Sequence, residues 1–273
     1  MKDYKILASD LDGTFLQPNR EVSAENWEAV KTLSEKGVFF VPCTGRTLGE
    51  MDAEIRDNPL VRYIIHSDGA VVYDKLTDQR ITMCMPRDAG HRLLDILFDY
   101  DAFYVTRHNK IAYVDSGFHN PEGHARCNVD SYYSEVLFQY GVPRDHFKNF
   151  CYSLDEIEMI NGFFRTDEDR VSCMERILGT GEFLVAPAKQ YMEIFHVSAG
   201  KGNALLRLAE ELGLDRSQTI GVGDSTNDMT LVKRAGLGLA MANACDALKA
   251  EADAIICSNR EHAIQYILEH YVK

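Results

Sequence analysis

The feature that most constrains the fold is a series of short apolar runs that each end in a polar segment. Residues 5–8, 38–41, 63–65 and 219–222 have the length and composition of buried strands. Helix-like spacing of apolar residues fills 24–36, which stops at Gly37, and 48–55. Strands that alternate with helices predict a parallel sheet with helices on both faces. We therefore expect an α/β fold with a Rossmann-like, doubly wound parallel-sheet core.

The middle of the chain follows a different pattern. Residues 87–100, 121–140 and 167–178 are helix-like, 102–114 has the pattern of a hairpin, and 158–165 and 182–185 are strand-like. We interpret this stretch as an inserted α/β domain over 84–188, with hinges at Met85-Pro86 and Ala186-Pro187. The core is then discontinuous, 1–83 and 189–273, and the strand-like run 191–197 falls in its second part.

Charge and cysteine content limit the partners and the compartment. The formal net charge of −13 disfavours nucleic acid and anionic membranes as partners. No apolar run approaches the roughly 20 residues that span a bilayer, and residues 1–10 lack the pattern of a signal peptide. The 7 cysteines are scattered without a Cys-x-x-Cys pair, so no disulfide framework or structural zinc site is expected, and Cys43 is interpreted as a buried strand residue. We expect a cytoplasmic protein and favour a monomer.

The first polar segment is Asp10-Leu11-Asp12-Gly13-Thr14. In an extended chain, residues two apart point to the same side, so Asp10 and Asp12 would face one small volume. Two adjacent carboxylates repel unless a cation lies between them or one of them keeps its proton. An ionised Asp10 beside a metal is a nucleophile, and a protonated Asp12 can act as a general acid and then as a base. The alternative is a plain turn, because Asp-Gly is a common turn pair.

Two further segments supply groups that bind anions. Thr44-Gly45-Arg46 follows an apolar run, and a hydroxyl with freed backbone N–H groups at such a turn forms a cradle for an anion. Lys201 begins a predicted helix, a position that is mildly unfavourable for a cation unless it faces an anion. Taken singly, an ordinary turn before a helix and a solvated surface lysine are the simpler explanations.

The last segment, residues 221–228, holds Asp224, Asn227 and Asp228 directly after a Gly-x-Gly strand end. Helix capping explains Asp228, but it does not explain the other oxygen ligands, which suit Mg²⁺. In open α/β sheets, ligands bind at the carboxyl ends of the strands, so the four segments are expected to converge on one site. Together they supply a nucleophile, an acid/base, a metal site, a hydroxyl and a lysine, as phosphoryl transfer requires.

The order and spacing of these segments resemble the haloacid-dehalogenase (HAD) superfamily, and within it the Cof-type phosphatases with a large α/β cap between the second and third motifs. Residues 240–244 and Ala252-Asp253 are also similar to that group. The resemblance implies that Asp10 attacks phosphorus and ligates Mg²⁺, and that Asp12 is the acid/base and offers its backbone oxygen to the metal. Phosphoryl binding would fall to Thr44, the backbone of Gly45 and Arg46, Lys201 and Asn227, whereas Asp224 would ligate the metal and Asp228 would support the metal site.

Some positions depart from the pattern of that group or carry no motif. Asp68 stands where the family usually has Asn, and an extra carboxylate near the site entrance would disfavour anionic substrate groups there. Glu261-His262 replaces the usual Asp-Gly and is interpreted as a local surface change. The cap is expected to close over the site and select the leaving group. Within it, we interpret 119–124 as a polar loop, and Tyr132 and Tyr133 as packing residues.

The favoured function is thus a magnesium-dependent phosphatase that acts on small phosphorylated metabolites, sugar phosphates among them, through a phospho-aspartate on Asp10. A phosphohexomutase shares these motifs and would return the phosphoryl group to a sugar. A non-catalytic regulator that binds phosphometabolites is disfavoured because the nucleophile is intact. A haloacid dehalogenase is also disfavoured, since that chemistry does not need Asp12 as a proton donor.

Overall fold

The computed structural model of the protein describes residues 3–188 and 191–272. The chain divides into two units, each described here by itself. The first unit consists of Met1–Gly45, Asp52–Thr82 and Gly200–Lys273, and the second of Arg46–Met51 and Met83–Ala199. The short segment Arg46–Met51 therefore belongs to the second unit, although the chain on both sides of it belongs to the first.

A five-stranded parallel sheet forms the core of the first unit. Its order is β16-β15-β14-β1-β2, and every neighbouring pair is parallel. The central strands are buried on both faces, which explains why they appear in the sequence as continuous apolar runs. This sheet confirms the predicted α/β class. The strands are β1 (Ile6–Ser9), β2 (Phe39–Pro42), β14 (Thr219–Gly223), β15 (Leu237–Ala240) and β16 (Ala254–Ile255).

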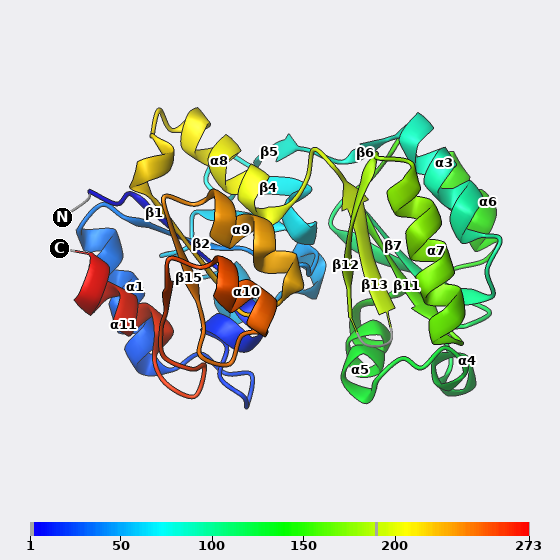
Figure 1. Ribbon diagram of the computed structural model, residues 1–273, viewed down its shortest axis with the longest axis horizontal. Helices are drawn as coiled ribbons and strands as arrows, with labels where there is room; N and C mark the ends of the chain where they lie inside the picture. Colours follow the sequence, from blue (N-terminus) through cyan, green and yellow to red (C-terminus); the bar gives the residue numbers. More distant parts are fainter. Residues whose placement is uncertain (1–2, 189–190, 273) are drawn as a thin grey trace. The chain divides into compact units, whose positions relative to one another are not determined.

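Helices cover both faces of this sheet. The helix α1 (Ala24–Glu35) connects β1 to β2, whereas α9 (Met229–Arg234) and α10 (Asp246–Glu251) connect the strands on the other side of β1. Right-handed connections that run in opposite directions place their helices on opposite faces. Accordingly, α1 packs with α11 (Ala263–Tyr271) and α9 packs with α8 (Lys201–Glu211), on opposite sides of the strands in Figure 1. The direction reverses between β1 and β14, and such a switch point is where open α/β sheets bind ligands.

The third apolar run does not continue the parallel sheet as predicted. The strand β3 (Tyr63–His66) pairs antiparallel with β4 (Val71–Asp74), which pairs with β5 (Gln79–Thr82). One parallel bridge between Cys43 and Ile65 joins β3 to the chain just after β2. The segment after β3 is therefore still tied to the carboxyl end of the parallel sheet.

The helix predicted over 48–55 is wrong. A short 3₁₀ turn, Leu48–Glu50, and a short helix α2 (Ala53–Arg56) are separated by Met51, whose backbone is extended. The side chains of Thr47 and Glu50 cap the 3₁₀ turn reciprocally, which favours a local turn over a continuous helix. The break coincides with the return of the chain from the second unit to the first.

The second unit is built on a six-stranded sheet of order β12-β13-β11-β7-β8-β9, antiparallel except for the β8–β9 pair. Side chains of β7 alternate between two apolar clusters, Ala102 and Tyr104 in one and Phe103 and Val105 in the other, so both faces of the sheet are covered. The strands of this sheet are β7 (Ala102–His108), β8 (Ile111–Asp115), β9 (Val142–Arg144), β11 (Met159–Phe164), β12 (Phe183–Pro187) and β13 (Tyr191–His196). A separate antiparallel pair is formed by β6 (Met85–Pro86) and β10 (Glu156–Ile157). The helices are α3 (Arg87–Leu97), α4 (Pro121–Arg126), α5 (Ser131–Tyr140), α6 (Phe147–Ser153) and α7 (Asp167–Gly179).

The end of the inserted unit lies later in the chain than expected. The predicted boundary, 188/189, touches residues 189–190, which lie outside the described part of the chain. However, β13 pairs with both β11 and β12, and the second unit extends to Ala199. Placing the strand 191–197 in the core was therefore wrong, because its hydrogen-bonding partners are strands of the second unit.

The helices in the described part of the chain are short, and α7, with 13 residues, is the longest of them. Across residues 3–188 and 191–272, no helix combines the length and the apolar character that crossing a membrane requires.

Candidate active site

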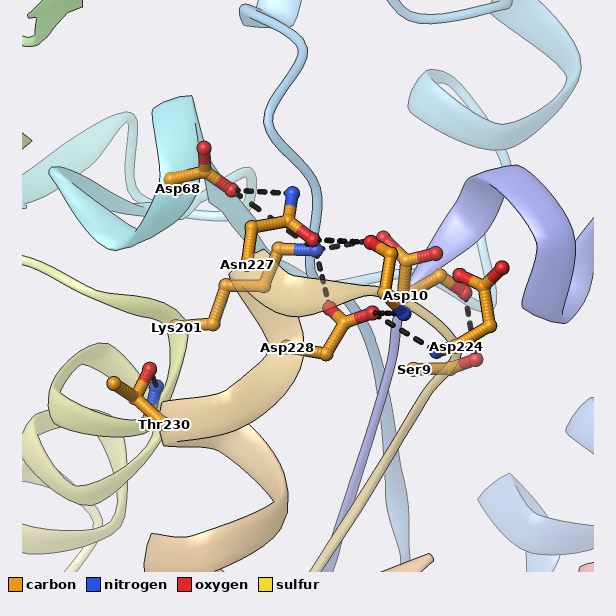
Figure 2. A network of polar contacts seen from close by, with 10 residues as sticks. Ser9, Asp10, Asp68, Lys201, Asp224, Asn227, Asp228 and Thr230 are labelled. Atoms are coloured by element: carbon orange, nitrogen blue, oxygen red, sulfur yellow. Dashed lines mark hydrogen bonds and ion pairs between the residues drawn. The ribbon is translucent and has the colours of Figure 1, made fainter. Parts of the chain in front are cut away.

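Asp10 follows β1 directly, beside the switch point of the sheet. Its backbone N–H donates to Val222 O on β14 at 3.0 Å, which holds it against the neighbouring strand. Its buried carboxylate accepts a hydrogen bond from Lys201 Nζ at 2.7 Å (Figure 2). Burial raises the pKa of Asp10 well above its usual value, and the Asp228 carboxylate raises it further, whereas Lys201 lowers it. An ionised Asp10 therefore depends on positive charge nearby.

The chain after Asp10 turns into a tight loop instead of staying extended. Leu11–Phe15 forms one π-helical turn in which Asp12 and Gly13 depart from helical angles. Asp12 is exposed, but its charge raises the pKa of both Asp10 and Asp224, so the three carboxylates interact. The interaction of Asp12 with Asp10 thus arises from a loop, and the alternation of an extended strand does not account for it.

Gly13 allows this loop to approach the end of β14. Its φ of +86° lies in the left-handed region, and a Cβ atom here would stand 2.3 Å from Asp224 Oδ2. The loop is also held from outside, because Asn243 Nδ2 donates to Gly13 O at 2.8 Å. Asn243 had no predicted role in the site, since a hydrogen bond across so much sequence leaves no local pattern.

Lys201 is the buried cation of the site. Its side chain is fully buried, and Nζ donates to Asp10 Oδ1 at 2.7 Å and to Asp228 Oδ1 at 2.6 Å. Burial lowers the pKa of Lys201, but the carboxylates of Asp10, Asp228 and Asp68 more than offset this and raise it well above its usual value. The alternative of a solvated surface lysine is therefore wrong.

The end of β14 contributes two more carboxylates. Asp228 accepts through Oδ2 from the backbone N–H groups of Asp224 at 2.9 Å and Ser225 at 3.0 Å, so both of its oxygens have partners. In contrast, Oδ1 of Asp224 is buried and has no hydrogen-bond partner. Burial, followed by the charge of Asp228, raises the pKa of Asp224 to about 7.

The carboxylates of this cluster fit a hard divalent cation. Asp10, Asp224 and Asp228 each offer an oxygen, and these oxygens all lie within 4.8 Å of one another. Lys201 alone does not balance these buried charges, and the orphaned Asp224 oxygen has no donor to satisfy it. Because Asp228 is already bound to Lys201 and two N–H groups, Asp10 and Asp224 are the better placed metal ligands. Carboxylate oxygens are the ligands that Mg²⁺ prefers.

Thr44 lies at the end of β2, next to the β1 end. Its N–H donates to Ile65 O at 2.9 Å, and its carbonyl oxygen accepts from Asp68 N at 3.1 Å, so both main-chain groups of Thr44 are held by the end of β3 and the turn after it. Gly45 is the last residue of the first unit before Arg46, whose guanidinium donates to Tyr132 OH at 2.9 Å within the second unit. Neighbouring Cys43 is fully buried and burial raises the pKa of its thiol well above its usual value, as expected for a strand residue.

The predicted position of Asp68 near the site entrance is wrong. Its side chain is fully buried and lies within the Lys201 network: Oδ1 accepts from Asn227 Nδ2 at 3.0 Å and lies 4.0 Å from Lys201 Nζ (Figure 2). A left-handed turn, with φ of 50° at both Ser67 and Asp68, directs the chain inward after β3. Local sequence does not reveal this, because Asp-Gly is compatible with many turns.

Residues 119–124 belong to a helix start instead of a polar loop. Asn120 caps α4 through its side chain, and His124 is buried, with its ring stacked 4.5 Å from that of Phe138. Tyr133 packs against Phe163 as expected, and its hydroxyl also accepts hydrogen bonds from Arg107 and Asn161.

His124 should make the second unit sensitive to acid. Burial lowers the pKa of His124 to about 4 from an ordinary value of 6.5. Within that window the unfolded chain binds a proton that the folded chain does not, so stability is lost as the pH falls from the upper to the lower value. We expect His124→Gln to show a smaller fall in melting temperature across this window than the wild type. An equal fall in both proteins would contradict a role for His124.

The sequence and the fold of this chain are similar to those of known proteins. The profile of the haloacid dehalogenase-like hydrolases matches residues 7–268. A 5-amino-6-(5-phospho-D-ribitylamino)uracil phosphatase of Bacillus subtilis is 28% identical, over 97% of each chain. The solved structure of a haloacid dehalogenase-like hydrolase from B. subtilis, 25% identical, superposes with a TM-score of 0.84 and covers 98% of this chain and 99% of its own. A HAD subclass IIB sugar phosphatase, 18% identical, has the same fold, with a TM-score of 0.82 over 98% of each chain.

Proposed function

Because the chain belongs to the haloacid dehalogenase-like hydrolases, we propose that it is a magnesium-dependent phosphatase that forms a phospho-aspartate on Asp10. The observation that carries this proposal is the buried contact of Asp10 with Lys201 inside a cluster of further carboxylates. A carboxylate held by a lysine and crowded by other acids is poised to react with an electrophile that arrives with a cation. The relatives are phosphatases that act on small phosphorylated metabolites, and this chain is a phosphoric monoester hydrolase of the same kind.

In the first step, an Asp10 oxygen attacks phosphorus and forms the aspartyl phosphate. The bond from phosphorus to the leaving oxygen breaks, and its electron pair goes to that oxygen, which takes a proton from Asp12. In the second step, Asp12 accepts a proton from water as the water attacks phosphorus. The bond to Asp10 breaks and returns the electron pair to its carboxylate, so phosphate is released and both residues are restored.

Other residues of the site hold the phosphoryl group and balance its charge. We assign phosphoryl binding to Thr44, the backbone of Gly45 and Arg46, and Asn227, and charge neutralisation to Lys201. The hydrogen bonds from Asp68 and to Ile65 keep Thr44 in place at the end of β2. Preorganised donors of this kind stabilise the charge that develops in the transition state.

The metal would be held by Asp10, by the backbone oxygen of Asp12 and by Asp224, with Asp228 in support. When bound, Mg²⁺ supplies positive charge that neutralises the phosphoryl oxygens and the acidic cluster. The unpartnered Asp224 oxygen is the structural support for this assignment.

For the substrate, we favour phosphate monoesters of small polyols and sugars. The named relatives act on a phosphorylated ribityl compound and on sugar phosphates. We assign the second unit as the cap that selects the leaving group, in line with its position in the sequence between Thr44 and Lys201. The cytoplasmic location and the monomeric state stay predictions.

Removal of divalent metal should abolish phosphate release. The acidic cluster lacks balancing charge without it, and a metal of this kind contributes several kcal/mol to the transition state, or about 10³-fold in rate. The experiment measures free phosphate from a panel of sugar and polyol phosphates and from p-nitrophenyl phosphate, before and after treatment with a chelator, and again after Mg²⁺ is added back. Full activity in the metal-free protein would refute the metal assignment, and isomerised sugar phosphate without free phosphate would favour the mutase.

A further inference from the structure

Asp68 is connected by its main chain to two segments of the active site. Its N–H donates to Thr44 O at 3.1 Å, and its carbonyl oxygen accepts from Gly200 N, the residue before Lys201, at 3.0 Å. Ser67, Asp68 and Gly69 are consecutive residues with φ of 50°, 50° and 84°, all in the left-handed region. A Cβ on Gly69 would stand 2.4 Å from the Gly200 backbone, so this turn is packed tightly against the start of α8. Non-glycine residues with such angles persist where the surrounding structure holds them, often at functional sites.

The side chain of Asp68 points from this turn to Asn227. Its Oδ1 accepts from Asn227 Nδ2 at 3.0 Å, and the side chain is fully buried. On the other side of the amide, Asn227 Oδ1 accepts from Ser225 Oγ at 2.6 Å. The amide group of Asn227 is therefore fixed at both ends, with its NH₂ toward Asp68 and its oxygen toward Ser225, as Figure 2 shows for the contact with Asp68.

A carboxylate at position 68 makes this orientation unambiguous. An ionised carboxylate offers only acceptors, whereas an asparagine offers both a donor and an acceptor and allows either orientation of a facing amide. The Lys201 ammonium group lies 4.0 Å from Asp68 Oδ1 and favours the ionised form of this buried carboxylate, although Lys201 is also paired with Asp10 and Asp228. The main-chain hydrogen bonds of residue 68 do not depend on its side chain, whereas the hydrogen bond from Asn227 requires an acceptor such as a carboxylate.

We propose that Asp68 is a positioning residue that fixes the Asn227 amide so that it presents a donor to the phosphoryl group. The inference rests on the proposed function, in which Asn227 binds that group. Asp68 does not touch the substrate and acts through Asn227. A side chain that is held in one rotamer, with its amide group in one orientation, loses less entropy on binding than a free side chain.

The test is a double-mutant cycle between Asp68 and Asn227. We expect Asp68→Ala to lower kcat/KM for phosphate release by about tenfold, the scale of losing a partner that orients a binding group, and to weaken inhibition by inorganic phosphate to the same extent. Asp68→Asn keeps an acceptor oxygen but also offers a donor that permits the opposite orientation of the Asn227 amide, so it should show a smaller loss of the same kind. In an Asn227→Ala background, Asp68→Ala should cause little further loss, because the residue on which it acts is gone.

The outcomes separate this inference from the proposed function. Wild-type protein that releases no phosphate would defeat the proposed function itself. Active wild type with an unimpaired Asp68→Ala variant, or with equal losses in the wild-type and Asn227→Ala backgrounds, would overturn the positioning role alone. Asp57→Ala, a change at an exposed aspartate of the same unit, is the matched control and should behave as wild type. Far-ultraviolet circular dichroism of each variant establishes that it is folded, and Asp68→Asn, which is nearly isosteric, keeps the test valid if Asp68→Ala fails to fold.

Discussion

Asp10→Asn should reduce the rate of phosphate release by at least about 10⁴-fold, the scale on which loss of a catalytic nucleophile acts. An amide oxygen does not form the aspartyl phosphate, so the first step is blocked and no later step can compensate. The replacement has nearly the same shape, and Lys201 keeps its 2.6 Å hydrogen bond to Asp228. The measurement is kcat at saturating substrate and Mg²⁺ for the variant and the wild type.

Stability provides the internal control for this variant. The pKa of Asp10 is raised by burial and by the neighbouring carboxylates, which means that the folded protein disfavours its ionised form. Removal of that charge should therefore leave the melting temperature unchanged or higher. Loss of activity together with a lower melting temperature would point to damaged folding, and activity within about tenfold of wild type would exclude Asp10 as the nucleophile.

Arg107→Ala should destabilise the second unit by about 3–5 kcal/mol, the cost of leaving one partner of a buried ion pair alone. Arg107 and Glu50 are each only 2% exposed, and the guanidinium donates to both carboxylate oxygens of Glu50, at 3.0 and 3.1 Å. It also donates to Asn161 and to Tyr133 OH. Burial raises the pKa of Glu50, but Arg107 more than offsets this and the pKa is lowered, so Glu50 would be strongly affected by the loss.

The effect on the second unit is best measured by hydrogen exchange of the β7 and β11 amides, because unfolding of a chain with two units need not be a single transition. The control is the double variant Arg107→Met with Glu50→Leu, which removes both charges. We expect it to be more stable than Arg107→Ala, since no buried charge is left unpaired. Faster exchange in the double variant than in Arg107→Ala would contradict this account.

The sequence predicts the strand ends well and the contacts between them poorly. Asp10, Lys201 and Asp224 stand out because each follows or begins an element with clear apolar periodicity, and the parallel sheet then brings them to one edge. The sequence does not predict where Asp68 lies, because a left-handed turn decides where its side chain points and no periodicity encodes that turn. β13 was assigned to the wrong unit for a similar reason, as strand pairing depends on residues far away in sequence.

The buried polar residues of the second unit also could not be predicted from the sequence. Arg107 lies near the end of a strand whose first four residues are apolar or aromatic, and a charge in such a strand usually faces solvent. Its partner Glu50 lies far away in the sequence, in the segment 48–55 whose apolar spacing predicts a helix. Only the fold brings the two together, so neither residue could be recognised as half of a buried pair.

The assignment of Arg46–Met51 to the second unit bears on how this protein can be recombined with its relatives. A chimera that exchanges only Met83–Ala199 would transplant Arg107 and leave Glu50 behind, with a foreign interior around it. Successful exchange therefore needs two grafts, one of them a stretch that begins immediately after Gly45. A substitution of Glu50 in that short stretch therefore requires a compensating substitution of Arg107 in β7, because either change alone leaves a buried charge without its partner.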